Sequence, residues 1–206
     1  MVYNHEIIKT KQEKAMTVAK EEEMFLLENL KKNKQIKEVA YCDSKDDQFK
    51  HRDIVYTTWS KPTYKKYIDV KGKKHYSQND TCTHRQWIEL QNAGGYKGWS
   101  QCMTTDYFAF VMDDGYYFVT PFDLKINGMG GMAHYDSDHN VDEHPYDVKQ
   151  KPLPDEYYRL YNRRDKDLIY MIPDDDIKNM AKIWMDYDGK FHKGKNKVKH
   201  LFDRND

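Results

Sequence analysis

The sequence predicts an α/β (α+β) fold with a mixed central sheet flanked by helices. Three observations predict it: an amphipathic segment near the start, short β-rich runs in the middle, and a strand followed by helix-capping residues near the end. The 206 residues suit one medium domain, and 17 Tyr, 8 Phe and 4 Trp supply the large side chains that a core needs.

The first predicted helix runs from Ala15 to Lys34. Apolar side chains recur there at helical spacing and share one face, with Glu and Lys around the rest. That face comprises Val18, Met24, Phe25, Leu27 and Leu30. Residues 1–13 are polar and predict an arm or a short first element.

Runs rich in β-branched and aromatic residues predict the strands of the sheet. They cover residues 37–41, 53–59, 64–70, 87–90, 105–112 and 116–120. Ser60-Lys61-Pro62 marks a turn between the second and third runs. Asp113-Asp114-Gly115 predicts a hairpin between the last two runs, because Asp-Gly favours tight two-residue turns.

Residues 1–125 are expected to form the core, and residues 126–206 an extension packed on the same domain. The stretch 127–154 is irregular, and residues 168–172 predict a strand. Pro173 and the three aspartates after it predict the start of a helix that includes Ile177, Ala181 and Trp184. The segment 190–199 is basic and predicts a mobile tail.

Charge is balanced, with 34 basic and 34 acidic residues. A neutral total argues against a protein that coats polyanions, but not against an enzyme whose acids gather at a metal while separate basic patches hold phosphate. Cys42, Cys82 and Cys102 show no close pairing, and neither a signal-peptide pattern nor a run of roughly 20 apolar residues occurs. We expect a cytoplasmic protein with no membrane partner, and the abundance of Lys, Asn, Asp and Tyr suggests a bacterial host cell or its phage.

Two acids and a lysine stand at matching ends of two predicted strands. Asp53 begins one strand, and Asp69-Val70-Lys71 ends the next. Because strand side chains alternate, Asp69 and Lys71 point to one face while Val70 points to the other. In a hairpin Asp53 would reach the same spot, and two converging carboxylates call for a hard divalent cation. The pattern predicts a Mg²⁺ site, with Mn²⁺ able to substitute, where Lys71 positions the water that attacks a phosphodiester.

The order strand, Asp, turn, strand, Asp-x-Lys resembles the PD-(D/E)xK nuclease superfamily, whose fold is that of restriction endonucleases. The runs WIEL and TTDYFAFVMDDGYYFVTPFDLK resemble the strands that follow the Lys in small phage-type and resolvase-like members. The resemblance covers residues 21–125, and Arg52 stands where the superfamily has a Pro before its first acid. It implies a restriction-endonuclease-like core and a metal-dependent endodeoxyribonuclease that acts on DNA.

The resemblance also assigns roles to further acids. It implies that Glu89, on a third core strand, joins Asp53 and Asp69 as a metal ligand. It also implies a catalytic acid on the leading helix, for which Glu23 is the candidate and Glu22 its nearest competitor.

Residues around the motif suit contacts with the nucleic acid. Gln91 lies two positions beyond Glu89 and is expected to contact substrate. Five lysines suit phosphate contacts, although an ordinary solubilising hairpin surface explains them equally well. They are Lys61, Lys65, Lys66, Lys73 and Lys74.

Two other groups of side chains could suggest zinc. One joins Cys82 and His84 with Cys102, and the other is the His/Asp-rich segment 134–147. Neither shows the CxxC or HExxH spacing that makes zinc predictions strong, so buried thiols and a polar loop are the preferred interpretation. The role of segment 134–147 is left open.

Two functions follow as hypotheses. The first is the Mg²⁺-dependent endodeoxyribonuclease; restriction-type, junction-resolving and exonuclease activities are not separated, and a double-strand cut would need a homodimer. The second is a catalytically silent protein on the same fold that binds DNA or a host protein, for example a phage anti-defence factor. The neutral charge and the long irregular stretch favour the second.

Overall fold

The computed structural model describes residues 3–42, 44–45, 49–72, 85–91, 96, 98–101, 104–125, 159–162 and 168–195. Its helices are α1 (Tyr3–Lys32), the 3-10 helix η1 (Trp99–Gln101), α3 (Pro121–Asp123) and α5 (Asp174–Met180). Its strands are β1 (Ile36–Tyr41), β2 (Ile54–Thr58), β3 (Lys61–Lys71), β4 (Arg85–Gln91), β5 (Tyr107–Met112), β6 (Gly115–Val119), β7 (Arg159–Asn162), β8 (Leu168–Pro173), β9 (Ile183–Met185) and β10 (Phe191–Lys193). None of the helices in these ranges combines the length and apolarity that a membrane crossing requires.

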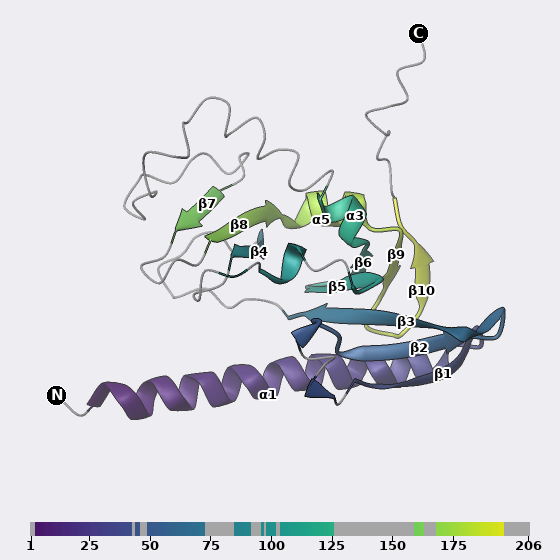
Figure 1. The fold of residues 1–206 in the computed structure, drawn as a ribbon, viewed down its shortest axis with the longest axis horizontal. Helices are drawn as coiled ribbons and strands as arrows, with labels where there is room; N and C mark the ends of the chain where they lie inside the picture. Colours follow the sequence, from purple (N-terminus) through teal and green to yellow (C-terminus); the bar gives the residue numbers. More distant parts are fainter. Residues whose placement is uncertain are drawn as a thin grey trace, which may run out of the picture.

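The strands form two sheets. The main sheet has seven strands in the order β1-β2-β3-β5-β6-β9-β10, and a second sheet has three in the order β4-β8-β7. Strands β3 and β5 are parallel, whereas every other described pairing is antiparallel. The fold is therefore mixed α/β, with a curled, mostly antiparallel main sheet flanked by helices (Figure 1). This confirms the predicted fold class at that level of detail.

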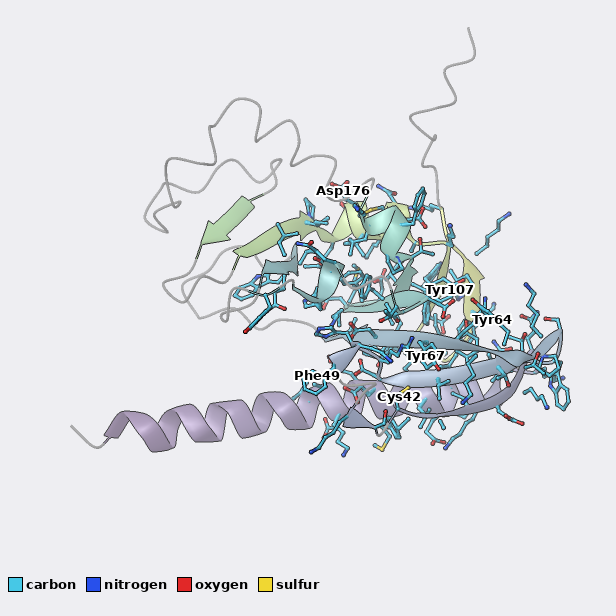
Figure 2. The ribbon with its side chains drawn as sticks, in the orientation of Figure 1. Cys42, Phe49, Tyr64, Tyr67, Tyr107 and Asp176 are labelled. Carbon is cyan, nitrogen blue, oxygen red and sulfur yellow. The ribbon has the colours of Figure 1, made fainter. Side chains whose placement is uncertain are left out.

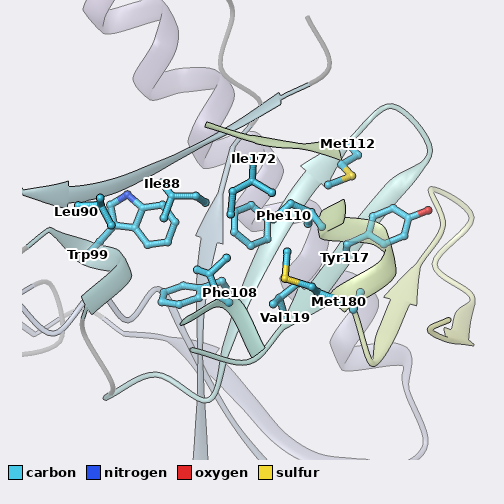
Figure 3. Close-up of a cluster of buried hydrophobic side chains, with 13 residues drawn as sticks. Ile88, Leu90, Trp99, Phe108, Phe110, Met112, Tyr117, Val119, Ile172 and Met180 are labelled. Atoms are coloured by element: carbon cyan, nitrogen blue, oxygen red, sulfur yellow. The ribbon is translucent and has the colours of Figure 1, made fainter. Parts of the chain in front are cut away.

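The middle of the main sheet is buried on both faces. Strand β5 shows this, because Ala109 and Val111 pack in one core cluster with α1, whereas Phe108 and Phe110 pack in another with β4, β8 and α5 (Figure 3). Burial on both faces explains why β5 is a continuous apolar run rather than an alternating one.

Helix α1 is longer than the sequence predicted. It begins at Tyr3, so the expectation of an arm or short element over residues 1–13 was wrong. Between Val18 and Lys32, where its side chains are described, the buried ones are Leu26, Leu27, Asn29 and Leu30, whereas Val18 and Met24 from the predicted apolar face are 37% and 53% exposed. These positions, in the C-terminal part of the helix, meet the core cluster that α1 shares with the sheet.

The two predicted hairpins form, with one shift in a turn. Met112 pairs with Gly115, which leaves Asp113 and Asp114 as a two-residue loop within the predicted Asp113-Asp114-Gly115 turn, and Gly115 is the first residue of β6. Gly115 has a φ of +147°, and a Cβ there would collide with the Met185 carbonyl oxygen, so this position requires glycine. In the other hairpin, Thr58 pairs with Lys61, so the turn is residues 59–60 rather than 60–62.

The C-terminal part differs most from expectation. Helix α5 ends at Met180, and Trp184 lies in strand β9, so the prediction of a helix through Trp184 was wrong. The outer edge of β6 offers unpaired backbone groups to β9, and Trp184 stacks between Tyr117 and His192. Residues 191–193 form β10, so this part of the expected mobile tail is a strand of the main sheet.

A buried carboxylate–lysine cluster as the candidate active site

The hairpin of β2 and β3 brings Asp53 to the end of β3. The Asp53 N–H donates to the Ile68 carbonyl oxygen at 2.9 Å, and Asp53 Oδ2 accepts a hydrogen bond from the Val70 N–H at 2.6 Å. The carboxylate therefore continues the hydrogen-bond ladder of the hairpin. These two contacts fix Asp53 next to the Asp69-Val70-Lys71 segment.

Asp69 is the most deeply buried charged group of the site. Its side chain is level with Phe108 of β5, the residue is only 2% exposed, and Oδ1 forms an ion pair with Lys71 Nζ at 2.7 Å. Burial is the main reason that the pKa of Asp69 rises to about 8, the neighbouring Asp53 carboxyl raises it further, and Lys71 opposes both.

Asp69 Oδ2 is a buried oxygen without a hydrogen-bond donor among the described residues. The Asp53 side chain is within hydrogen-bonding range of Asp69, but two ionised carboxylates have no proton to share. A buried oxygen left in this state is costly, so the pair needs either a shared proton or a bound cation.

Lys71 lies between the acid and an aromatic ring. Its Nζ atom is 4.3 Å from the centre of the Trp99 ring, and its side chain is 18% exposed. Trp99 belongs to η1, in the crossover that leads from β3 to the parallel strand β5, and its backbone N–H donates to Glu89 Oε2 at 3.4 Å. Trp99 therefore contacts both Lys71 and Glu89.

Glu23 of α1 is close enough to Asp53 and Lys71 for their charges to affect its pKa. Burial first, and then the Asp53 carboxylate, raises the pKa of Glu23 to about 7, while Lys20 and Lys71 lower it. Glu22 lies beside β3 as well, because a Cβ on Gly72 would collide with its carboxylate, and its carbonyl oxygen accepts from the Tyr116 hydroxyl at 2.9 Å. The leading helix therefore presents two acids near the end of β3.

Glu89 lies in another sheet than expected. The run WIEL is a strand, as predicted, but β4 pairs with β8 in the second sheet and does not lie beside β3. The expectation that this strand joins β2 and β3 in one central sheet was therefore wrong. Strand β4 instead pairs with β8, which is distant in the sequence. The pairing is irregular between Glu89 and Gln91, and the Gln91 side chain lies outside the described part of the chain.

His51 is a neighbour that the sequence did not reveal. It has a φ of 51°, in the left-handed region that non-glycine residues seldom occupy. Burial, followed by the charge of Lys71, lowers the pKa of His51, while Glu89 and Asp53 act in the opposite direction. A lone histidine in a charged loop carries no sequence signal, and only the fold brings His51 within electrostatic reach of these groups.

The predicted phosphate-contacting lysines do not all lie near the acids. Lys61 and Lys65 are exposed toward the turn of the β2–β3 hairpin. At about 3.3 Å per residue, Lys61 is on the order of 26 Å from Asp69 along β3. Lys66 is nearer, with its Nζ 5.8 Å from the Tyr107 ring centre. Lys73 and Lys74 lie outside the described residues, as do Cys82, Cys102 and segment 134–147.

Asp53 and Asp69 have the chemistry that a hard cation requires of its ligands, although they are only two residues. Asp53 and Asp69 offer carboxylate oxygens, the donors that Mg²⁺ prefers, and one oxygen is buried without a partner. Among the described residues, no three His, Cys, Asp or Glu side chains are arranged closely enough to hold a metal ion. The pair therefore constitutes a two-carboxylate site, with Glu23 and Glu89 in its surroundings.

Comparison of this chain with protein-family models, with curated proteins and with solved structures found no match.

Proposed function

We propose that the chain is a metal-dependent endodeoxyribonuclease with a restriction-endonuclease-like core. The observation that supports the proposal most directly is the buried, unpartnered Oδ2 of Asp69 beside Asp53, with Lys71 bound to the other oxygen of Asp69. Two carboxylates and a lysine at the end of a hairpin are the constellation predicted from the sequence. Helix α1 packed on a mixed sheet supports the core assignment.

In this proposal Asp53 and Asp69 hold the cation, and Lys71 acts on the attacking water and the phosphate. Mg²⁺ held there would supply charge stabilisation for the phosphodiester and would lower the pKa of the attacking water. The Lys71 ammonium, steered by Asp69 and the Trp99 ring, orients the attacking water and neutralises charge on the phosphate. Phe108 and Trp99 exclude bulk water from one side of the site, which strengthens these interactions.

Nicking of a supercoiled plasmid in the presence of Mg²⁺ or Mn²⁺ tests the proposal. We expect the wild type to nick, and Asp69→Ala and Lys71→Ala to lose roughly 10²- to 10³-fold in rate, because each removes a preorganised electrostatic group. Nicking is the suitable readout because one such site cuts one strand. Equal rates in all three proteins would end the nuclease proposal.

The alternative, a catalytically silent protein that binds DNA or a host protein, also has a specific observation in its favour. The described residues offer two carboxylates rather than three at the cation position, and Lys71 is already paired with Asp69. A protein that binds DNA and fails to nick it in either metal would support this alternative.

A further inference from the structure

The free end of the β2–β3 hairpin exposes two large aromatic side chains. Residues 59–65, here called the hairpin tip, are all exposed, and within them Trp59 is 64% and Tyr64 is 57% exposed. Figure 2 shows Tyr64 toward the free end of the hairpin and Tyr67 nearer its middle. Aromatic rings exposed together at one tip are more than the scattered apolar residues of an ordinary surface.

The hairpin tip has a fixed backbone and stands beyond the interior of the sheet. The Trp59 N–H donates to the Gln35 carbonyl oxygen at 3.2 Å, which joins the turn to the chain just before β1. On the other side, β5 pairs with β3 only from Ile68 onward, so β5 does not pair with the hairpin tip. The rings are therefore displayed by an anchored hairpin end rather than by a free loop.

The charge of this segment is one-sided. Between Asp53 and Asp69 the chain carries three lysines and no acidic residue, whereas the whole chain has 34 basic and 34 acidic residues. Two of the lysines, Lys61 and Lys65, lie in the hairpin tip itself and alternate in the sequence with the two aromatic residues. Exposed rings interleaved with lysines match the chemistry of unpaired nucleotides, which offer a stacking face and a phosphate at every step.

We propose that the hairpin tip binds single-stranded DNA, with bases stacked on Trp59 and Tyr64 and phosphates held by Lys61 and Lys65. A duplex keeps its base faces stacked inside the helix, so it could use the lysines but not the rings. Resting on the proposed nuclease function, this makes the substrate a DNA with an unpaired strand.

The hairpin also sets the reach from the tip to the acids. From Trp59 back to Asp53 the strand spans about 20 Å at roughly 3.3 Å per residue. A DNA strand held at the hairpin tip would therefore run about 20 Å along the hairpin before it reaches Asp53.

Fluorescence anisotropy of a labelled single-stranded oligonucleotide, and of the same sequence as a duplex, tests the inference. All proteins carry Asp69→Asn and are studied with a chelator, so that binding is measured apart from cleavage. We expect Trp59→Ala and Tyr64→Ala each to weaken single-strand binding by about 5- to 100-fold, the loss typical of one stacking ring. Duplex binding should change less than twofold.

Phe122→Ala is the matched control, because Phe122 is 53% exposed on α3, away from the hairpin. It should leave both affinities unchanged. Lys65→Gln should instead weaken both DNA forms and lower the salt dependence of binding. Unchanged single-strand affinity in the two tip variants, or an equal loss on the duplex, would overturn the inference. Because this experiment measures binding and not cleavage, its result can be interpreted even if the nicking assay fails.

Discussion

Replacing Asp69 with Asn is expected to stabilise the metal-free protein at pH 8.5 while removing its nicking activity. Burial raises the pKa of Asp69 to about 8, so at pH 8.5 a desolvated charge is present with one oxygen unpartnered. The amide is uncharged, keeps an acceptor for Lys71 and can donate to Asp53. We expect the free energy of unfolding to rise by about 1 kcal/mol or more, because a pKa raised in the folded state means that the ionised Asp69 is disfavoured there even with Lys71 beside it.

Asp114→Asn is the matched control for this experiment. The Asp114 carboxylate accepts from the Tyr117 hydroxyl at 2.8 Å and from Lys178 at 2.9 Å, and these hydrogen bonds lower its pKa despite the opposing burial. The same substitution there should lower stability and leave nicking intact. Chemical denaturation of the three proteins at pH 8.5 makes the comparison. If Asp69→Asn proves as destabilising as Asp114→Asn, the view of Asp69 as a strained buried acid is wrong.

The metal-free protein is expected to lose stability as the pH rises from about 5 to 8. The folded-state pKa values of Glu23 and Asp69 are raised to about 7 and about 8. Both groups therefore bind protons more tightly when folded; their contribution is complete below their ordinary pKa values and is lost as the pH rises through the raised ones. Asp69 alone contributes at most about 1.4 kcal/mol per pH unit.

Denaturation of the wild type at a series of pH values, with chelator and then with Mg²⁺ or Mn²⁺, measures this effect. A cation that binds the folded state should restore stability most at the high end of the range, where both carboxylates are ionised. The double variant Glu23→Gln, Asp69→Asn should show a flatter profile. A wild-type profile that rises from pH 5 to 8 in chelator would contradict the placement of these acids.

The convergence of Asp53, Asp69 and Lys71 could be predicted because it follows from local rules. Alternation puts Asp69 and Lys71 on one face, and a short hairpin puts Asp53 opposite. The hairpin of β5 and β6 was predictable for the same reason, since its signal is local, although Gly115 lies in β6 and the loop is Asp113-Asp114.

Features that depend on distant partners were not predictable. The pairing of β4 with β8 moves Glu89 into a second sheet, and no pattern within WIEL encodes that choice. Trp184 follows a helix-like spacing after α5, yet the open edge of β6 and a stack on Tyr117 place it in a strand. His51 depends on the loop before Asp53 in the same way.

Titration of the metal-free protein with Mn²⁺, followed by calorimetry, tests the paired-carboxylate site most directly. The geometry of Asp53 and Asp69 predicts one binding event per chain in the wild type, its loss in Asp53→Asn and in Asp69→Asn, and its retention in Asp114→Asn. No binding in the wild type, or the same binding in all four proteins, would contradict the existence of a cation site between these two acids.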